Sequence, residues 1–82
     1  MSLIDEFISR MEDLGYCSAA YILANAFAST CDKNFSVNFH EASYRLDGGN
    51  KKLLAELIFI DKRPGYSRQK QMAVFKWLEA NS

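Results

Sequence analysis

The sequence predicts an all-α fold, a compact bundle of four to five short helices in one small domain over residues 1–82. Three observations support this prediction. Apolar residues recur every three to four positions through most of the chain, glycine and proline fall between these segments, and 49% of the residues are hydrophobic. An apolar share of this size is ample for one packed core.

The first two helices are predicted over residues 3–14 and 18–29. The first has an apolar face opposite a charged one, with Ser2 as its N-cap and Gly15 as the left-handed residue that ends it. The second is helix-prone and apolar almost all round, so it is expected to be the central helix. Asn25 is the exception there, either an internal hydrogen-bonding residue or part of an exposed strip.

Residues 35–60 allow two interpretations. The favoured one is a short extended lead-in, a helix over 38–46, a break at 47–50 and a fourth helix over 51–60. The alternative treats Asp-Gly-Gly-Asn at 47–50 as a hairpin turn between two strands. That would give an α+β fold of two helices, a β-hairpin over 35–60 and a C-terminal helix.

The last helix is expected after a turn at residues 63–66, where Pro and Gly occupy the central positions of a type II turn. Ser67 can cap this helix, which would run to about Ala80. In the helix before the turn, Lys52 is spaced to pair with Glu56. The core candidates of the last helix are Val74, Phe75, Trp77 and Leu78.

Charge is distributed unevenly along the chain, although the formal net charge is zero. Residues 1–44 carry six acids and two bases, whereas residues 45–82 carry four acids and eight bases. Such polarity can steer a partner or let two copies pair as a homodimer, and it also arises when two halves of one domain face each other.

Aromatic residues and arginine dominate the hot spots of protein interfaces, which directs attention to the second half of the chain. The candidate partner-binding residues are Lys51, Lys52, Arg63, Tyr66, Arg68, Lys70 and Trp77. Tyr44 is a further aromatic candidate. The competing interpretation places Trp77 and Tyr44 in the core, where aromatic residues are commonly buried.

No pattern in the sequence predicts catalysis, so the protein is not expected to be an enzyme or to need a cofactor. One histidine, His40, among many serines does not specify a nucleophile and its base. A phosphate-binding loop is also missing from the sequence. The available metal ligands lack a close Cys-Cys or His-His pair, which makes a metal site unexpected; they are Cys17, Cys31, Asp32, His40 and Glu41.

A nucleic-acid-binding function is the alternative to protein binding. The basic second half could place residues 67–71 in a groove of DNA as the start of a recognition helix. Against this, the preceding turn is about five residues long where helix-turn-helix motifs use three or four. The isoelectric point is only about 6.5, and the acidic half would be repelled by phosphate unless it faced away.

A cytoplasmic location is expected. No apolar run approaches the roughly 20 residues of a membrane span, and residues 2–14 carry four acids where a signal peptide would be basic and then apolar. Cys17 and Cys31 are too far apart for a disulfide if one helix connects them, and two reduced thiols are typical of the cytosol.

From Phe39 onward the chain has a helix ending in Leu46-Asp47, a leucine-rich helix, a Pro-Gly-Tyr turn and a basic helix with Trp77. This order resembles small all-helical uncharacterised proteins of bacteria, phages and other mobile elements. The resemblance implies binding to a host or competing protein, for instance as an inhibitor of a defence system. The leading expectation is therefore a non-enzymatic protein–protein interaction module.

Overall fold

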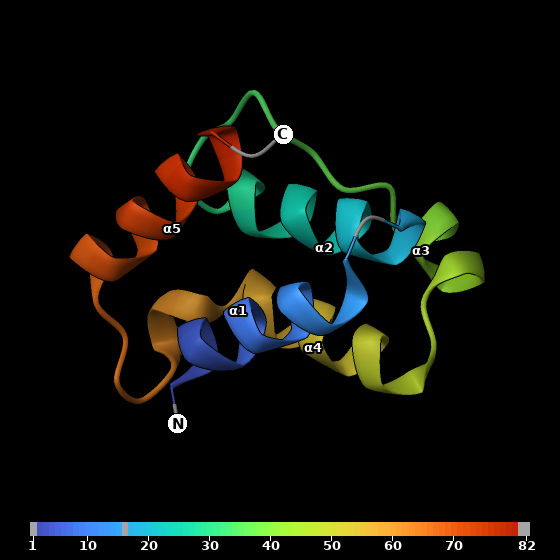
Figure 1. Ribbon diagram of the computed structural model, residues 1–82, viewed down its shortest axis with the longest axis horizontal. Helices are drawn as coiled ribbons and strands as arrows, with labels where there is room; N and C mark the ends of the chain where they lie inside the picture. Colours follow the sequence, from blue (N-terminus) through green and yellow to red (C-terminus); the bar gives the residue numbers. More distant parts are fainter. Residues whose placement is uncertain (1, 16, 81–82) are drawn as a thin grey trace.

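The computed structural model describes residues 2–15 and 17–80, and the fold is all-α within them (Figure 1). The elements are α1 (Leu3–Leu14), α2 (Ser18–Ser29), α3 (Phe39–Arg45), α4 (Gly48–Ile58), a short 3-10 helix η1 (Ile60–Lys62) and α5 (Arg68–Ala80). The predicted helical bundle is confirmed, and the hairpin alternative for residues 35–60 is wrong, since this segment holds two helices and no strand.

Two side-chain caps explain why helices form where a hairpin was considered. The Asn38 side chain accepts a hydrogen bond from the backbone N–H of Glu41 at 3.0 Å, and Asp47 accepts one from Asn50 at 2.8 Å. Each cap satisfies an otherwise unpaired N–H in the first turn. Because Asp47 caps it, α4 begins at Gly48, inside the segment that was predicted to be a break.

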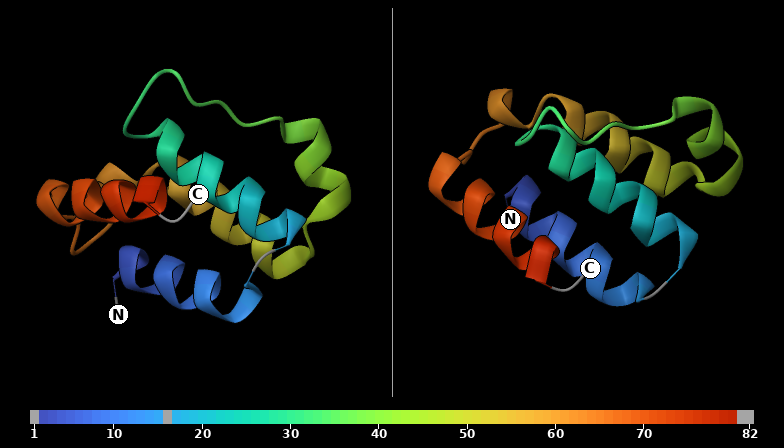
Figure 2. Two further views of the ribbon diagram at one scale, coloured as in Figure 1. Left: turned by 45° about the horizontal axis from the view of Figure 1, so that its top comes forward. Right: turned by 90° about the horizontal axis from the view of Figure 1, so that it is seen from above.

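Helix α2 is the centre of the bundle, as predicted, since it packs against α1, α3, α4 and α5. Helices α1 and α4 lie side by side below it, α3 closes one end, and α5 covers the other end (Figures 1 and 2). The rings of Phe7 and Phe27 stack at the α1–α2 contact with their centroids 4.6 Å apart. The largest fully buried side chains are Phe7, Leu23, Phe27, Leu53 and Leu57.

A polar contact inside the bundle joins α1 to α4. The Arg10 guanidinium donates a hydrogen bond to the Asn50 side-chain carbonyl, and Asn50 is almost fully buried. Glu56, which was expected to pair with Lys52, instead lies 4.0 Å from the Arg63 guanidinium beyond the end of α4. The chain turns back after α4 and brings Arg63 to Glu56, so the fold decides this pairing and not the spacing of residues along the helix.

The turn before α5 has the predicted type II geometry. Gly65 has a φ of 79°, and the Tyr66 N–H donates to the Arg63 carbonyl at 3.2 Å. Ser67 then accepts a hydrogen bond from the Lys70 N–H at 3.3 Å, as expected of a cap. This geometry aims α5 back across the end of α2.

Two expected core aromatics are exposed. Tyr44 is 77% exposed and Trp77 is 42% exposed, so their assignment to the core is wrong. On α5 the buried stripe consists of Gln71, Val74 and Phe75, while Leu78 is half-buried. Trp77 follows Val74 by three residues but lies at the edge of this stripe, facing the space between α5 and α1.

Candidate functional site

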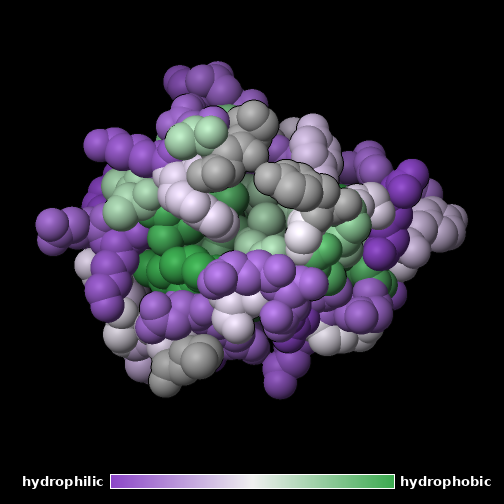
Figure 3. Space-filling view, in the orientation of Figure 1, coloured by the Kyte–Doolittle hydropathy of each residue, from purple (hydrophilic) through white to green (hydrophobic). Residues whose placement is uncertain are grey.

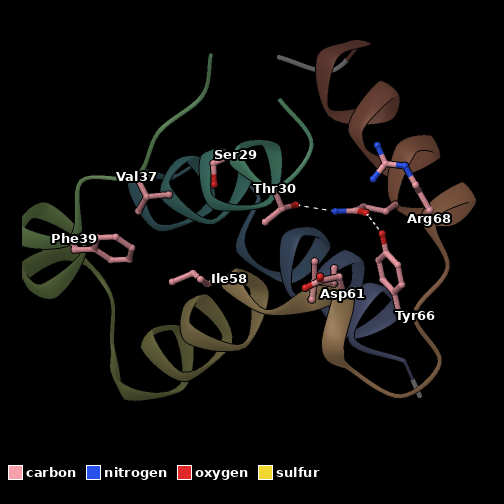
Figure 4. Close-up of a pocket in the computed structure, with 10 residues that line it drawn as sticks. Ser29, Thr30, Val37, Phe39, Ile58, Asp61, Tyr66 and Arg68 are labelled. Atoms are coloured by element: carbon pink, nitrogen blue, oxygen red, sulfur yellow. Dashed lines mark hydrogen bonds between the residues drawn. The ribbon is translucent and has the colours of Figure 1, made fainter. Parts of the chain in front are cut away.

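Two of the predicted binding residues, Tyr66 and Arg68, line one surface groove of about 420 Å³ (Figure 4). This volume falls within the usual range of ligand pockets, about 300–1,000 Å³. We call it the Phe39–Arg68 groove. Its apolar lining residues are Val37, Phe39, Ile58 and Ile60, and its polar ones are Ser29, Thr30, Asp61, Tyr66, Arg68 and Gln71.

One end of the groove is apolar. Figure 4 shows Val37, Phe39 and Ile58 gathered there, across the groove from Tyr66 and Arg68. Phe39 is 59% exposed and Ile58 is 40% exposed. Each lies at a helix end, where neighbours three and four residues away cover it on one side only. Covering such a side chain fully is worth about 1.5–3 kcal/mol, so this end favours an apolar occupant.

The other end is held by a chain of side-chain hydrogen bonds (Figure 4). The Tyr66 hydroxyl donates to the Gln71 carbonyl oxygen, and the Gln71 amide donates to the Thr30 hydroxyl at 2.9 Å. The Thr30 hydroxyl in turn donates to the Phe27 backbone carbonyl at 2.6 Å. Gln71 is only 2% exposed, and its bonds tie α5 to the end of α2. A satisfied buried network of this kind fixes the shape of the groove wall.

Arg68 supplies the free charge of the groove. It is exposed at the first position of α5 and makes no ion pair within the described part of the chain. Charged residues of the preceding segment are paired instead: Lys62 lies 3.8 Å from Asp61, which also lines the groove, and Arg63 lies 4.0 Å from Glu56. The guanidinium can therefore receive a carboxylate or another planar anion with two parallel hydrogen bonds.

The described residues hold no cluster of three or more His, Cys, Asp or Glu side chains that could bind a metal ion. His40 is exposed on α3, where it makes an edge-to-face contact with Tyr44. Near the groove, burial raises the pKa of the Cys31 thiol, and the smaller effects of Thr30 and Arg68 oppose this rise. The thiol is therefore protonated at neutral pH, the form that is a poor nucleophile.

The remaining predicted binding residues lie elsewhere. Arg63 joins the groove only indirectly, through the turn that positions Tyr66. Lys51 and Lys52 are exposed near the start of α4, whereas Ile58 ends that helix. Lys70 is exposed on α5 and influences Asp5 on α1. The structure therefore splits the predicted basic surface into separate parts.

Sequence reasoning missed several groove residues. Gln71 gave a usable signal, because it precedes Val74 and Phe75 by three and four residues and so occupies the core stripe of α5. A polar residue at such a position needs a buried partner, which is Thr30 here. Phe39 gave no signal of exposure, because it precedes the buried Ala42 by three residues and this spacing predicts burial.

Comparison with protein-family models, with curated proteins and with solved structures finds no match to this chain. The resemblance of residues 39–82 to helical proteins of phages and mobile elements stays a prediction. Within the described residues, no helix has the length and apolar character needed to cross a membrane.

Proposed function

We propose that this protein is a non-enzymatic, cytoplasmic protein-interaction module whose Phe39–Arg68 groove binds an acidic, apolar segment of a partner protein. One observation carries the proposal: two exposed apolar side chains, Phe39 and Ile58, share a groove with a guanidinium that has no ion-pair partner in the described structure. The apolar end would take a large aliphatic or aromatic side chain, and Arg68 a nearby Asp or Glu.

A protein segment fits this groove better than a nucleic acid. Residues 59–67, including η1, separate α4 from α5, which is longer than the turn of a helix-turn-helix motif. Basic side chains also alternate with acids, since Arg63 lies beside Glu56 and Lys62 beside Asp61. Nucleic-acid binding by the basic half stays a prediction, which a gel shift at low salt would test.

The proposed cellular setting rests on two thiols and a resemblance. Cys17 and Cys31 are both free, which is typical of a reducing compartment. Modulation or inhibition of a host protein, which the resemblance to phage and mobile-element proteins implies, is one biological form that such a module would take. The partner would then supply the acidic segment.

A random-peptide display selection on the full chain tests the groove directly. Selected peptides should pair an apolar residue with Asp or Glu and bind at micromolar affinity by calorimetry. Arg68→Glu should weaken binding at least about tenfold, which corresponds to about 1.4 kcal/mol. Lys52→Glu, a reversal of an exposed charge on α4, should leave binding unchanged.

Helix α3 offers a matched pair for the apolar end. Phe39→Ser should abolish peptide binding, whereas Tyr44→Ser should not, because both side chains are exposed but only Phe39 lines the groove. Peptides without acidic residues, or equal binding by the Arg68→Glu and Lys52→Glu variants, would refute the proposal. A salt-sensitive gel shift lost in Arg68→Ala would instead favour the nucleic-acid function.

A further inference from the structure

A second groove lies between α1 and α5 and extends onto the first half of α2; the structure places Trp77 in it. It consists of two adjoining hollows of about 730 and 410 Å³ that share Glu12 and Trp77. Figure 3 shows an apolar area between α5 and α1 framed by hydrophilic side chains. We call this the α1–α5 groove; its apolar lining includes Ile8, Met11, Ala20, Val74, Trp77 and Leu78.

The two walls of this groove run in the same direction, as Figures 1 and 2 show for α1 and α5. Two observations indicate their register. A Cβ atom at Gly65, three residues before α5, would lie 3.7 Å from the Ser2 Cβ at the N-cap of α1. The pKa of Asp5 is lowered by its hydrogen bond to Ser2 and, to a lesser extent, by the charge of Lys70. Glu12 and Trp77 border the same two hollows, about two helical turns further along.

The rims of the groove carry opposite charges. Asp5 and Glu12 are exposed and seven residues apart, so they share one stripe along α1. Lys70 is exposed and precedes Ala73 by three residues and Trp77 by seven, so it lies on the stripe of α5 that these two groove-lining residues mark. One wall therefore presents two carboxylates to solvent, and the other presents an ammonium group at the level of Asp5.

Two copies can face each other through this groove in two arrangements with twofold symmetry, and only one of them brings opposite charges together. A twofold axis parallel to the groove would place α5 of each copy over α1 of the other, with Asp5 opposite Lys70 and Glu12 opposite Trp77. A twofold axis across the groove would instead face α1 against α1 and oppose carboxylate with carboxylate. Symmetric pairing through one patch is the commonest form of homo-oligomer.

We infer that the α1–α5 groove is the interface of a parallel homodimer, in which each copy covers the apolar floor of the other. The rotation carries Trp77 of each copy onto the Ile8–Glu12 stretch of the second copy. Aromatic residues at the centre of an apolar patch with a charged rim are the usual anchors of protein interfaces. This inference does not depend on the Phe39–Arg68 groove, because the two grooves share no lining residue.

Trp77 is the single tryptophan of the chain, so its fluorescence reports on this interface alone. Analytical ultracentrifugation should show a monomer–dimer equilibrium, and the emission maximum should shift to shorter wavelength as the dimer forms. Asp5→Lys and Lys70→Glu should each raise the dimer Kd about tenfold. The double variant should recover most of the affinity, because the pair is restored with its charges exchanged.

Asp13→Lys is the matched control, since it reverses another exposed charge of α1 that lies off the Asp5–Glu12 stripe, and it should leave the dimer Kd unchanged. Circular dichroism checks that each variant folds. A chain that stays monomeric at about 1 mM would overturn the inference. So would a dimer that resists both single reversals and leaves the Trp77 emission unchanged, because that dimer would use another face.

Discussion

The two grooves use opposite ends of α2 and are built on different principles. The Phe39–Arg68 groove has a wall of directional hydrogen bonds through Thr30 and Gln71, whereas the α1–α5 groove has an apolar floor with charged rims. A fixed polar wall selects the orientation and chemistry of an occupant, while an apolar floor mainly contributes contact area. The polar-walled groove is therefore the one we propose for a foreign segment, and the apolar one is the one we propose for self-association.

The largest expected effect comes from the support that both grooves share. Phe27 is fully buried, stacks on Phe7 of α1 and carries the carbonyl that accepts the Thr30 hydrogen bond. Phe27→Ala should cost about 3–5 kcal/mol, a large part of the stability of a small domain, and should disable both grooves. Urea denaturation followed by circular dichroism measures the loss.

Phe59→Ala is the control for that substitution. Phe59 is 63% exposed, so its removal should change the free energy of unfolding by no more than about 0.5 kcal/mol. Similar losses for Phe27→Ala and Phe59→Ala would mean that the α1–α2 stack is not the common support of the two grooves.

A substitution with a smaller effect on stability should impair one groove and leave the other intact. Gln71→Leu leaves the Tyr66 and Thr30 hydroxyls without their partner and should cost about 1–3 kcal/mol. Binding of a selected peptide should weaken, while the dimer Kd should stay unchanged. Gln69→Leu, an exposed change two residues earlier on α5, should affect neither. If it proves as costly as Gln71→Leu, the polar network does not stabilise the groove.

The smallest effect concerns α1 alone. The Ser2 hydroxyl donates to the Asp5 carboxylate at 2.8 Å and accepts from the Asp5 N–H at 3.2 Å. Ser2→Ala should cost about 1 kcal/mol through the lost cap and should raise the pKa of Asp5 towards its ordinary value. The Phe39–Arg68 groove should bind its peptide unchanged.

The pH dependence of this substitution has a definite sign. Because the folded-state pKa of Asp5 lies below the unfolded value, its contribution to stability is present above the ordinary Asp pKa of about 4. It is lost as the pH falls through the folded pKa. The stability difference between wild type and Ser2→Ala should therefore shrink in acid, and an NMR titration of the Asp5 carboxyl should show the raised pKa. A difference that does not change with pH would contradict the Ser2–Asp5 bond.

Local signals in the sequence proved reliable where they acted within a few residues. The bounds of α1 and α2, the Ser2 and Ser67 caps, and the type II turn at residues 63–66 all follow from neighbouring residues and are confirmed. The start of α4 was misplaced because Asp47 was interpreted as part of a turn rather than as a cap. An Asp before Gly-Gly is expected both in a turn and as a helix N-cap, so the local sequence does not distinguish the two roles.

The sequence by itself determined the helical class, the identity of the central helix and the segregation of charge between the two halves. Only the tertiary structure decided which side chains come together: Gln71 bonds to Thr30, Phe39 and Ile58 line one groove, and Lys70 lies near enough to Asp5 to affect its pKa. Helix formation and capping depend on residues three and four positions apart. A groove depends on how helices distant in the sequence pack around α2, so local spacing can mark Gln71 as buried but does not identify its partner.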